Sequence, residues 1–291
     1  MKRAIALVLG CLVPAIAFTE QGVQRGHLIL VGGGDKPPEA MRKFVELAGG
    51  PEAPIAVVPT ASEEADTGEY YVKLFGEEHG CRRVTVLPIK TREDAMSAEL
   101  AELAAGAKGI FFAGGDQNRV TKALLDTPVG AAVAAAYRAG AVVGGTSAGT
   151  ACQSALMITG EGDFKVVRAG AVELARGLGF FRGVIVDQHF VARQRSNRLL
   201  SAILEHPDLL GVGVDEDTAI WVRPGGDFTV IGERSVVVLD AAGAQVRRGK
   251  GGAGEGLLGV TGLAVHVLLP GETFDVAKRA PIPHAVPAPA R

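Results

Sequence analysis

A serine held between small residues is the position in this chain best suited to nucleophilic chemistry. Residues 144–150 read G-G-T-S-A-G-T, so that Ser147 lies between Gly145 and Gly149 in G-x-S-x-G spacing. An apolar run precedes this motif, and a segment able to form a helix follows it. A strand, a tight turn and a helix in that order are typical of a nucleophile elbow, where the turn leaves no room for larger neighbours. The pattern predicts a nucleophilic Ser147; the plainer interpretation is a glycine-rich turn with an incidental serine.

A serine nucleophile needs a base, and the chain offers six histidines. Only His189 is expected at the carboxyl end of a strand, where the elbow also lies, so we expect it to be the general base. An acid must orient the imidazole and stabilise its protonated form. Glu161 and Asp163 follow the expected elbow helix, and Asp187 shares the face of an extended strand with His189. All three acids are candidates for this role, and each can instead be an exposed loop carboxylate.

The negative oxygen that develops during acyl transfer needs nearby N–H donors. The amide of Ala148, next to the serine, is one expected donor. The amide of Gly115, within the sequence G-G-D-Q at residues 114–117, is the other, since glycine allows close approach of the backbone. The alternative for this segment is an ordinary turn that opens a helix, with Asp116 as its cap.

Three arginines follow the histidine closely. Arg195 and Arg198 are three residues apart and share one helical face, while Arg193 can precede the helix. Charges of this kind are usually solvated and contribute little. Beside a catalytic histidine they can instead bind substrate carboxylates through paired hydrogen bonds, which is the interpretation we favour.

The elements that position these residues alternate along the chain. Strands are expected at residues 27–31, 54–58, 83–89, 108–113, 140–143, 181–186 and 211–214. Helices are expected at residues 38–47, 63–78, 92–105, 119–125, 130–138, 151–157 and 193–204. The strands are unbroken apolar runs, which indicates an α/β fold with a mainly parallel sheet covered by helices on both faces. Short apolar segments between residues 219 and 269 predict a small antiparallel β addition near the C-terminus. In such folds, sites form beyond the carboxyl ends of the strands.

Composition excludes several classes of function. The formal net charge of −2 gives no basic surface for nucleic acid. Aromatic residues make up only 5% of the chain, which argues against a surface that stacks on bases. No Cys and His spacing indicates a zinc site, and the glycines at residues 32–34 lack the spacing of a phosphate loop. Cys81 and Cys152 can form a disulfide but do not require one.

The two ends of the chain differ from its middle. Residues 1–17 combine a Lys-Arg start, an apolar stretch and an A-x-A site, which predicts a signal peptide cleaved after Ala17 and a secreted or periplasmic protein. The apolar stretch is too short to span a membrane. A lipoprotein with Cys11 lipidated is the alternative. We expect a peptidase domain at residues 27–240, a β-rich extension at 241–279 and a disordered tail at 280–291.

Several of these stretches together resemble the cyanophycinases, serine peptidases related to the aspartyl dipeptidases. The resemblance covers about residues 27–240 and rests on four motifs, at residues 112–117, 145–149, 187–198 and 213–219. It implies a fold akin to class I glutamine amidotransferases, and a homodimer without metal or cofactor. It also implies hydrolysis of multi-Arg-poly-Asp (cyanophycin) to β-Asp-Arg dipeptides, with Ser147 as nucleophile and His189 as base.

The resemblance extends to the substrate pocket. The positions that match that family's pocket are Gln117, Asp187, Gln188, Arg193, Arg195 and Arg198. The chain departs from the family at the acid of the triad, where the nearest alignment gives Lys165; a shift of a few residues selects Asp163 or Glu161. Two other functions stay open: an α-aspartyl dipeptidase with the same chemistry, and a catalytically silent module that binds acidic peptides.

Overall fold

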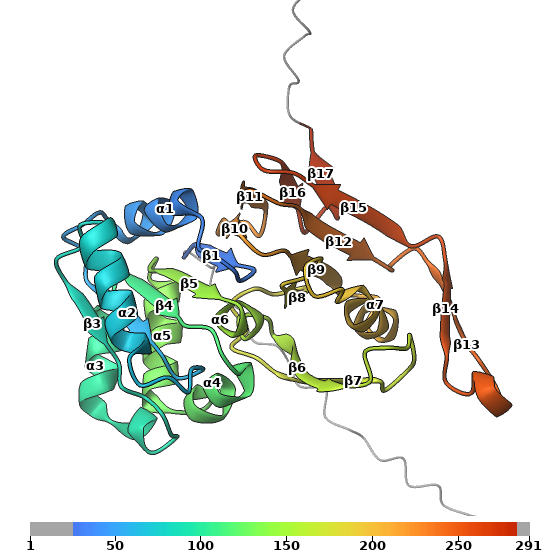
Figure 1. The fold of residues 1–291 in the computed structure, drawn as a ribbon, viewed down its shortest axis with the longest axis horizontal. Coiled ribbons are helices and arrows are strands. Elements are labelled where there is room, and N and C mark those ends of the chain that lie inside the picture. Colours follow the sequence, from blue (N-terminus) through green and yellow to red (C-terminus); the bar gives the residue numbers. More distant parts are fainter. Residues whose placement is uncertain (1–25, 284–291) are drawn as a thin grey trace, which may run out of the picture.

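The computed structural model describes residues 26–283, which form two neighbouring β-sheets with helices packed around them (Figure 1). The larger sheet contains a parallel half in the order β1-β5-β4-β2-β3. Its strands are β1 (Leu28–Val31), β2 (Ile55–Val58), β3 (Val84–Val86), β4 (Gly109–Phe112) and β5 (Val142–Thr146). All five strands were expected, and the α/β fold class is confirmed.

An antiparallel half continues the same sheet from β1. Strand β10 pairs antiparallel with β1, and β11, β16 and β17 follow it outward. These strands are β10 (Thr218–Val222), β11 (Phe228–Gly232), β16 (Thr273–Asp275) and β17 (Ala280–Ile282). Of the segments expected in the antiparallel addition, residues 219–222 and 228–231 lie in β10 and β11 of this sheet, whereas those at 236–239 and 263–269 belong to the second sheet. Residues 280–282, which we expected in a disordered tail, form β17; residues 284–291 lie outside the described part of the chain.

The second sheet has four strands in the order β15-β12-β9-β8. Strands β8 (Val184–Gln188) and β9 (Leu210–Val214) are parallel to each other. Strand β12 (Val236–Asp240) is antiparallel to both of its neighbours, β9 and β15 (Ala264–Leu268). The strand that ends at the elbow and the strand that ends at His189 thus belong to different sheets. A hydrogen bond from the His189 amide to the Gly32 carbonyl oxygen, 2.7 Å long, joins the two sheets at the rim.

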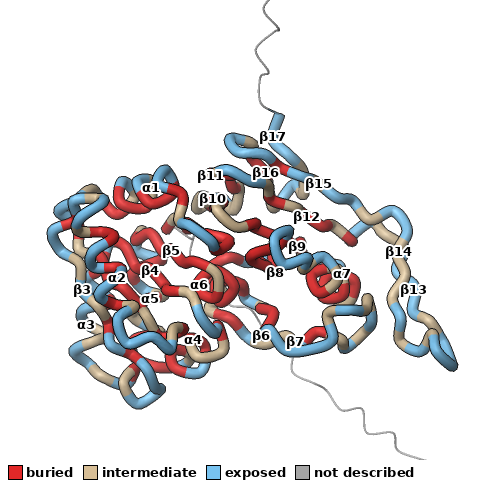
Figure 2. The backbone as a smooth tube through the Cα atoms, in the orientation of Figure 1, coloured by how far each residue is buried: buried red, intermediate tan, exposed pale blue. Residues whose placement is uncertain are grey.

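The parallel strands are apolar throughout because helices cover both of their faces. On one face, Ile29, Val31 and Val57 pack against α1 (Pro38–Ala48) and α2 (Thr67–Lys73). On the other face, the alternate residues, such as Leu28 and Leu30, belong to a core shared with the remaining helices of this layer. Those helices are α3 (Ala98–Gly106), α4 (Gln117–Leu124) and α5 (Pro128–Arg138). The buried strands appear as a red centre in Figure 2.

The chain departs from expectation after the elbow. Helix α6 (Ala148–Ala151) is a single turn, and the chain then enters β6 (Leu156–Gly162) and its antiparallel partner β7 (Val172–Arg176), where we expected a longer helix and an irregular segment. Gln153 contributes to this early end, because its side-chain amide donates to the Gly149 carbonyl oxygen at 2.6 Å. Helix α7 (Ser196–Glu205) covers the second sheet.

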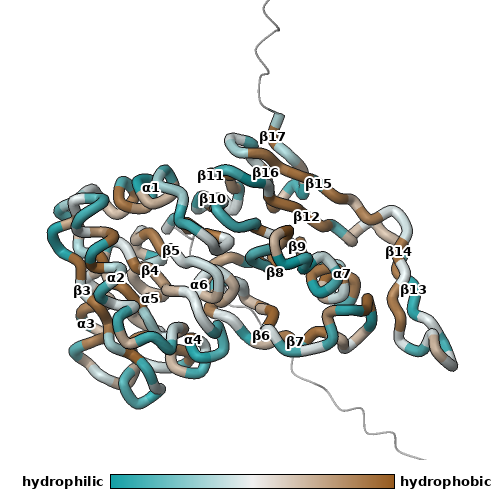
Figure 3. Tube along the Cα trace, viewed as in Figure 1, coloured by the Kyte–Doolittle hydropathy of each residue, from teal (hydrophilic) through white to brown (hydrophobic). Residues whose placement is uncertain are grey.

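The periphery carries a hairpin and an exposed strand. Strands β13 (Gln245–Arg248) and β14 (Leu258–Thr261) form the hairpin that projects from the body in Figure 1, and the glycine-rich residues 249–256 form its tip. Strand β15 is apolar in Figure 3 and largely exposed in Figure 2. Among residues 26–283, no helix has both the length and the apolar character needed to cross a membrane.

Candidate active site

The serine sits on a strained turn between β5 and α6. Ser147 has a φ of 53° and a ψ of −114°, a conformation that side chains rarely adopt outside functional turns. A Cβ atom on Gly145 would lie 2.2 Å from the Gly149 carbonyl oxygen, and one on Gly149 would lie 2.2 Å from the Phe112 carbonyl oxygen. Both flanking positions therefore require glycine, as a nucleophile elbow demands.

The expected nucleophile and base are in contact. Ser147 Oγ lies 2.8 Å from His189 Nε2, although the two residues come from different sheets. The loop after β1 holds the ring from the other side: a Cβ atom on Gly33 would lie 2.2 Å from His189 Cε1. The triple glycine that begins this loop thus allows the backbone to pack directly against the imidazole.

The acid beside the histidine is Glu216, which the sequence analysis did not single out. Its Oε1 lies 2.6 Å from His189 Nδ1, so that both ring nitrogens are occupied, one by the acid and one by the serine. Glu216 follows β9 and lies within the motif at residues 213–219 that carries part of the family resemblance. The sequence offered one signal for this acid: it comes just after a predicted strand, as His189 does.

The three acids that we proposed for this role lie elsewhere. Glu161 and Asp163 are exposed near the end of β6, because α6 stops early and the chain carries both residues away from the imidazole. Asp187 does not share a face with His189, because the histidine has a φ of 49° and breaks the alternation of the strand. The expectation that one of them orients His189 is therefore wrong.

The acids on either side of Glu216 hold the rim together. Asp215 Oδ1 accepts hydrogen bonds from the amides of Val191 and Ala192, 3.1 and 2.9 Å long, and so fixes the turn that follows His189. Asp217 Oδ1 accepts from the Asp35 amide at 2.8 Å and fixes the loop after β1. Both loops that touch the imidazole are thereby tied to the segment that carries Glu216.

The surroundings of His189 favour its neutral form. Burial lowers the pKa of its imidazole below the ordinary value of 6.5, and the positive charges of Arg193 and Arg195 act in the same direction. The hydrogen bond to Glu216 opposes them and raises the pKa. The net direction is downward, so the ring is unprotonated at neutral pH and can accept a proton from the serine hydroxyl.

A cavity of about 470 Å³ opens beside Ser147; we call it the arginine cavity. Its walls include Gly115, Gln117, Glu161, Gln188, Arg193, Arg195 and Arg198. Of the expected pocket residues, only Asp187 lies behind this wall: it is buried and accepts two hydrogen bonds from Arg198, one of them 2.7 Å from Arg198 Nε. The cavity therefore brings together the elbow, the glycine loop and the arginines that the sequence placed far apart.

The residues of this cavity differ in how firmly other groups of the protein hold their side chains. Arg195 donates to the Gln188 carbonyl oxygen at 2.8 Å, and burial lowers the pKa of its guanidinium to about 10, which leaves it charged at neutral pH. Gln117 is buried and donates to the carbonyl oxygens of Ile158 and Thr159. The side chain of Arg193 is 55% exposed and reaches to 3.8 Å from Glu216. Arg193 is thus the cavity cation with the fewest internal partners, whereas Arg195 is held by both oxygens of Gln188 and lies 3.9 Å from Asp187.

Of the two expected oxyanion donors, Gly115 lines this cavity, and Ala148 directly follows Ser147, which also lines it. Ala148 is the first residue of α6, and a helix leaves the amides of its first turn without an internal acceptor. Gly115 lines the cavity with a φ of 138°, and a Cβ atom there would lie 2.0 Å from the Ala61 carbonyl oxygen. Asp116 caps α4 through the Asn118 amide at 2.8 Å, so the loop also serves as the helix start that we gave as its alternative.

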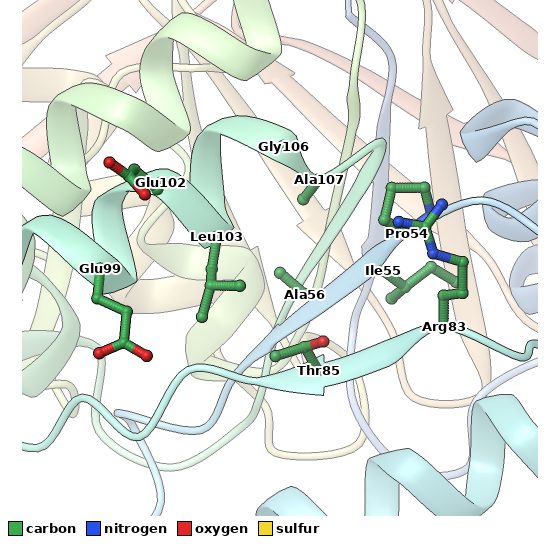
Figure 4. A pocket seen from close by; sticks show the side chains of 10 residues that line it. All are labelled: Pro54, Ile55, Ala56, Arg83, Thr85, Glu99, Glu102, Leu103, Gly106 and Ala107. Carbon is green, nitrogen blue, oxygen red and sulfur yellow. The ribbon is translucent and has the colours of Figure 1, made fainter.

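Other parts of the molecule lack this chemistry. A cavity of about 300 Å³ lies at the amino ends of β2 and β3, on the opposite edge from the elbow, and α3 contributes Glu99, Glu102 and Leu103 to its wall (Figure 4). Its wall contains no Ser, Cys or His side chain. Within residues 26–283, no group of three or more His, Cys, Asp or Glu side chains is arranged to hold a metal ion. Cys81 and Cys152 are buried free thiols.

Comparisons with known proteins place the chain in a family. The sequence model of peptidase family S51 matches residues 28–231. The cyanophycinase of Trichormus variabilis is 37% identical over 270 residues, which are 91% of this chain and 90% of that protein. The cyanophycinase of Geminocystis herdmanii is 34% identical over 263 residues, covering 89% of this chain and 96% of its own.

The fold has a close counterpart of known structure. A peptidase from an acI-B1 actinobacterium superposes with a TM-score of 0.65 at 25% identity, covering 88% of this chain and 98% of its own. The family resemblance read from the motifs is confirmed by the sequence match and by these relatives. The chain belongs to peptidase family S51 and is a serine-type peptidase.

Proposed function

We propose that this protein is an exported cyanophycinase, a serine exopeptidase that hydrolyses multi-Arg-poly-Asp and releases β-Asp-Arg dipeptides. The observation that carries the proposal is the line from Glu216 through His189 to Ser147, which opens directly into the arginine cavity. The 37% identity to a cyanophycinase over nine tenths of the chain supports the same substrate class.

Acylation follows from the geometry of the elbow. His189 Nε2 takes the proton of the Ser147 hydroxyl while Oγ bonds to the carbonyl carbon of the scissile peptide bond. The carbonyl oxygen becomes negative and is held by the amides of Ala148 and Gly115. The C–N bond then breaks, and Nε2 gives its proton to the departing nitrogen. Glu216 stabilises the imidazolium that exists between these two transfers.

Deacylation uses the same groups in reverse roles. Water attacks the ester carbon on Ser147 and gives one proton to His189 Nε2, and the same amides hold the oxyanion. When the bond between the carbonyl carbon and Oγ breaks, the proton returns from Nε2 to Oγ, which restores the enzyme. The carboxylic acid product leaves the cavity, so no metal or redox group enters the balance.

The walls of the arginine cavity suit a substrate unit that carries both signs of charge. Release of intact β-Asp-Arg from multi-Arg-poly-Asp requires cleavage between successive aspartates, so each unit presents a carboxylate and a guanidinium. Arg193 and Arg195 can bind the carboxylate, and Glu161, which also lines the cavity, can bind the guanidinium. The buried pair of Asp187 and Arg198 supports the arginine side of the cavity.

Product analysis tests this proposal. The wild-type protein is expected to release β-Asp-Arg from cyanophycin, detected by mass spectrometry, while Ser147→Ala releases none. Parallel incubation with α-Asp-X dipeptides tests the aspartyl dipeptidase alternative; cleavage of those dipeptides without action on cyanophycin would reject the proposed substrate. A fluorophosphonate that leaves Ser147 unmodified in the folded wild-type protein would instead favour the silent binding module.

Export is a separate part of the proposal. It rests on residues 1–17, which lie outside the described residues, and on the A-x-A site that ends at Ala17. We expect the mature protein in the periplasm or the medium to begin at Phe18. Amino-terminal sequencing checks this, and incorporation of labelled fatty acid at Cys11 would replace it with the lipoprotein alternative.

We also propose that the protein forms a homodimer. Strand β15 supports it, because Val265 and Val267 of this edge strand, and Leu269 just after it, are each more than half exposed. Apolar side chains of this kind are typical of surfaces that associate. Analytical ultracentrifugation of the wild-type protein and of Val267→Lys measures the state and the contribution of this strand.

A further inference from the structure

Ser147 lies between two cavities. One is the arginine cavity, and the other, of about 430 Å³, is formed by the loops after β1 and β2 and by α2; we call it the Lys36 cavity. Its wall includes Lys36, Glu64, Asp66, Tyr70, Tyr71 and His189. A peptide bound across the nucleophile must therefore place one side of its scissile bond in each cavity.

The position of the base decides which side goes where. His189 lines the Lys36 cavity, whereas Gly115, an expected oxyanion donor, lines the arginine cavity. The departing nitrogen must receive its proton from His189 Nε2, so the amine side of the bond lies where the imidazole is accessible. This directs the amine side into the Lys36 cavity and the acyl side into the arginine cavity.

The Lys36 cavity holds a positioned cation. Lys36 Nζ lies 5.1 Å from the ring centroid of Tyr70 and 5.8 Å from that of Tyr71, distances at which an ammonium is attracted by aromatic faces. Tyr71 is 3% exposed and packed into the core, so it gives the ammonium a rigid support. Among the ion pairs of residues 26–283, none uses Lys36, which leaves its charge available to a ligand.

The same cavity also carries negative charge. Glu64 and Asp66 lie on the loop between β2 and α2, both exposed and both on the wall of the cavity. Ser62 orders this loop, because its Oγ accepts hydrogen bonds from the Glu64 amide and the Thr67 hydroxyl, 3.1 and 2.6 Å long. The cavity therefore offers one fixed cation and two anions beside the point where the leaving nitrogen emerges.

We infer that the Lys36 cavity is the subsite for the amine-side unit of the substrate, in which Lys36 binds the carboxylate of that unit and Glu64 and Asp66 bind its guanidinium. The inference rests on the proposed function for the identity of the unit, and on the placement of His189 for its direction. It assigns the leaving dipeptide to a site of its own, separate from the arginine cavity. The bond that breaks and the proton that moves are those of the acylation step given above.

Two substrates with the same acyl part separate the two sides. One is a soluble oligomer of Asp units bearing β-linked Arg; the other is the same acyl unit as a 4-nitroanilide, whose leaving amine carries no charge. Lys36→Met is expected to lower kcat/KM for the oligomer about tenfold or more and to change that for the anilide by less than about twofold. Lys36→Arg keeps the charge and restores most of the oligomer rate, and Lys108→Met, an exposed lysine before β4, is the matched control.

A second pair of substrates tests the anions. Citrulline has the shape of arginine without its charge, so wild-type protein should prefer arginine over citrulline in the amine-side unit. The double variant Glu64→Gln with Asp66→Asn should remove that preference while the anilide rate stays unchanged. Circular dichroism and thermal melting of each variant establish that it is folded.

The outcomes distinguish the inference from the function on which it rests. Oligomer hydrolysis by the wild type that is unaffected in Lys36→Met, or equal losses on oligomer and anilide, overturns the subsite and leaves the proposed function intact. Turnover of the anilide by the wild type without any turnover of the oligomer overturns the proposed substrate and the subsite with it. A loss confined to the oligomer supports the assignment.

Discussion

Replacement of Glu216 by glutamine is the sharpest test of the proposed triad. The Glu216 carboxylate lies 2.6 Å from His189 Nδ1, and its side chain is 25% exposed. In the transition state the imidazole becomes positive, and a carboxylate about 4 Å from the centre of that charge stabilises it by about 4 kcal/mol at an effective dielectric constant of about 20. Glutamine keeps the size of the side chain and removes this charge.

That energy corresponds to a loss of about 10³ in kcat, since each 1.36 kcal/mol or so is a factor of about ten. Glutamine can also turn its amide N–H toward Nδ1 and so place the ring proton on Nε2, where it cannot accept from Ser147; loss of the correct tautomer brings the expected decrease toward about 10⁴. KM should change little, because the acid touches no substrate.

The assay compares kcat and KM of the wild type, Glu216→Gln and Asp163→Asn on the anilide substrate. Asp163 is exposed and accepts a hydrogen bond from the Lys165 amide, so its variant should retain full activity. The rate of fluorophosphonate labelling of Ser147 should fall in parallel with kcat. A Glu216→Gln protein that keeps more than about a tenth of the wild-type kcat, or a large loss in Asp163→Asn, would refute the assignment of the acid.

Three other outcomes follow from the same geometry. Gly33→Ala should lower kcat about 100-fold, because its Cβ would meet His189 Cε1 at 2.2 Å and a displacement of about 1 Å at the base is costly. The melting temperature should also fall, since Gly33 has a φ of 113°, and a folded variant with full activity would show that the loop does not position the ring. Arg193→Gln should move the acidic limb of the pH profile of kcat/KM to higher pH, because a positive charge that lowers the pKa of His189 is lost. That limb lies below pH 6.5 in the wild type. Arg193→Lys should leave the limb in place, and a shift to lower pH in Arg193→Gln would contradict the electrostatics. Arg198→Met should lower the free energy of unfolding by about 3 kcal/mol in urea denaturation, because the buried Asp187 carboxylate loses its paired hydrogen bonds and keeps only the more distant Arg195 as a cation. Arg176→Met, which breaks an exposed pair, should cost less than about 1 kcal/mol, and equal losses would mean that the buried pair does not stabilise the fold.

Local signals in the sequence were sufficient for the parallel strands and for the elbow. The spacing of Gly145 and Gly149 reports a steric constraint within a few residues, and the structure shows backbone atoms at both positions where a side chain would need space. The apolar runs likewise report burial on both faces of the sheet, so β1, β2, β4 and β5 could be predicted closely.

The acid could not be predicted in this way, because its position depends on tertiary structure. Glu216 reaches the imidazole only because β9 lies next to β8 in a second sheet, an arrangement without a local signature. The single residue His189, with its positive φ, also turns the ring away from the face of Asp187 and removes the acid that strand alternation favoured. The short α6 had the same effect on Glu161 and Asp163, since a longer helix would have sent the chain in another direction.

The reactive groups are far apart in the sequence, and this affects when activity can arise during synthesis of the chain. Elbow, imidazole and carboxylate are separated by 42 and 27 positions, and the loop that braces the ring comes from the first strand. A ribosome-bound chain that has exposed Ser147 alone holds an ordinary hydroxyl, and no partial chain lacking residue 216 has a complete relay. Hydrolytic capacity should thus switch on late and abruptly during synthesis, a built-in safeguard against premature cleavage that requires no removable inhibitory segment.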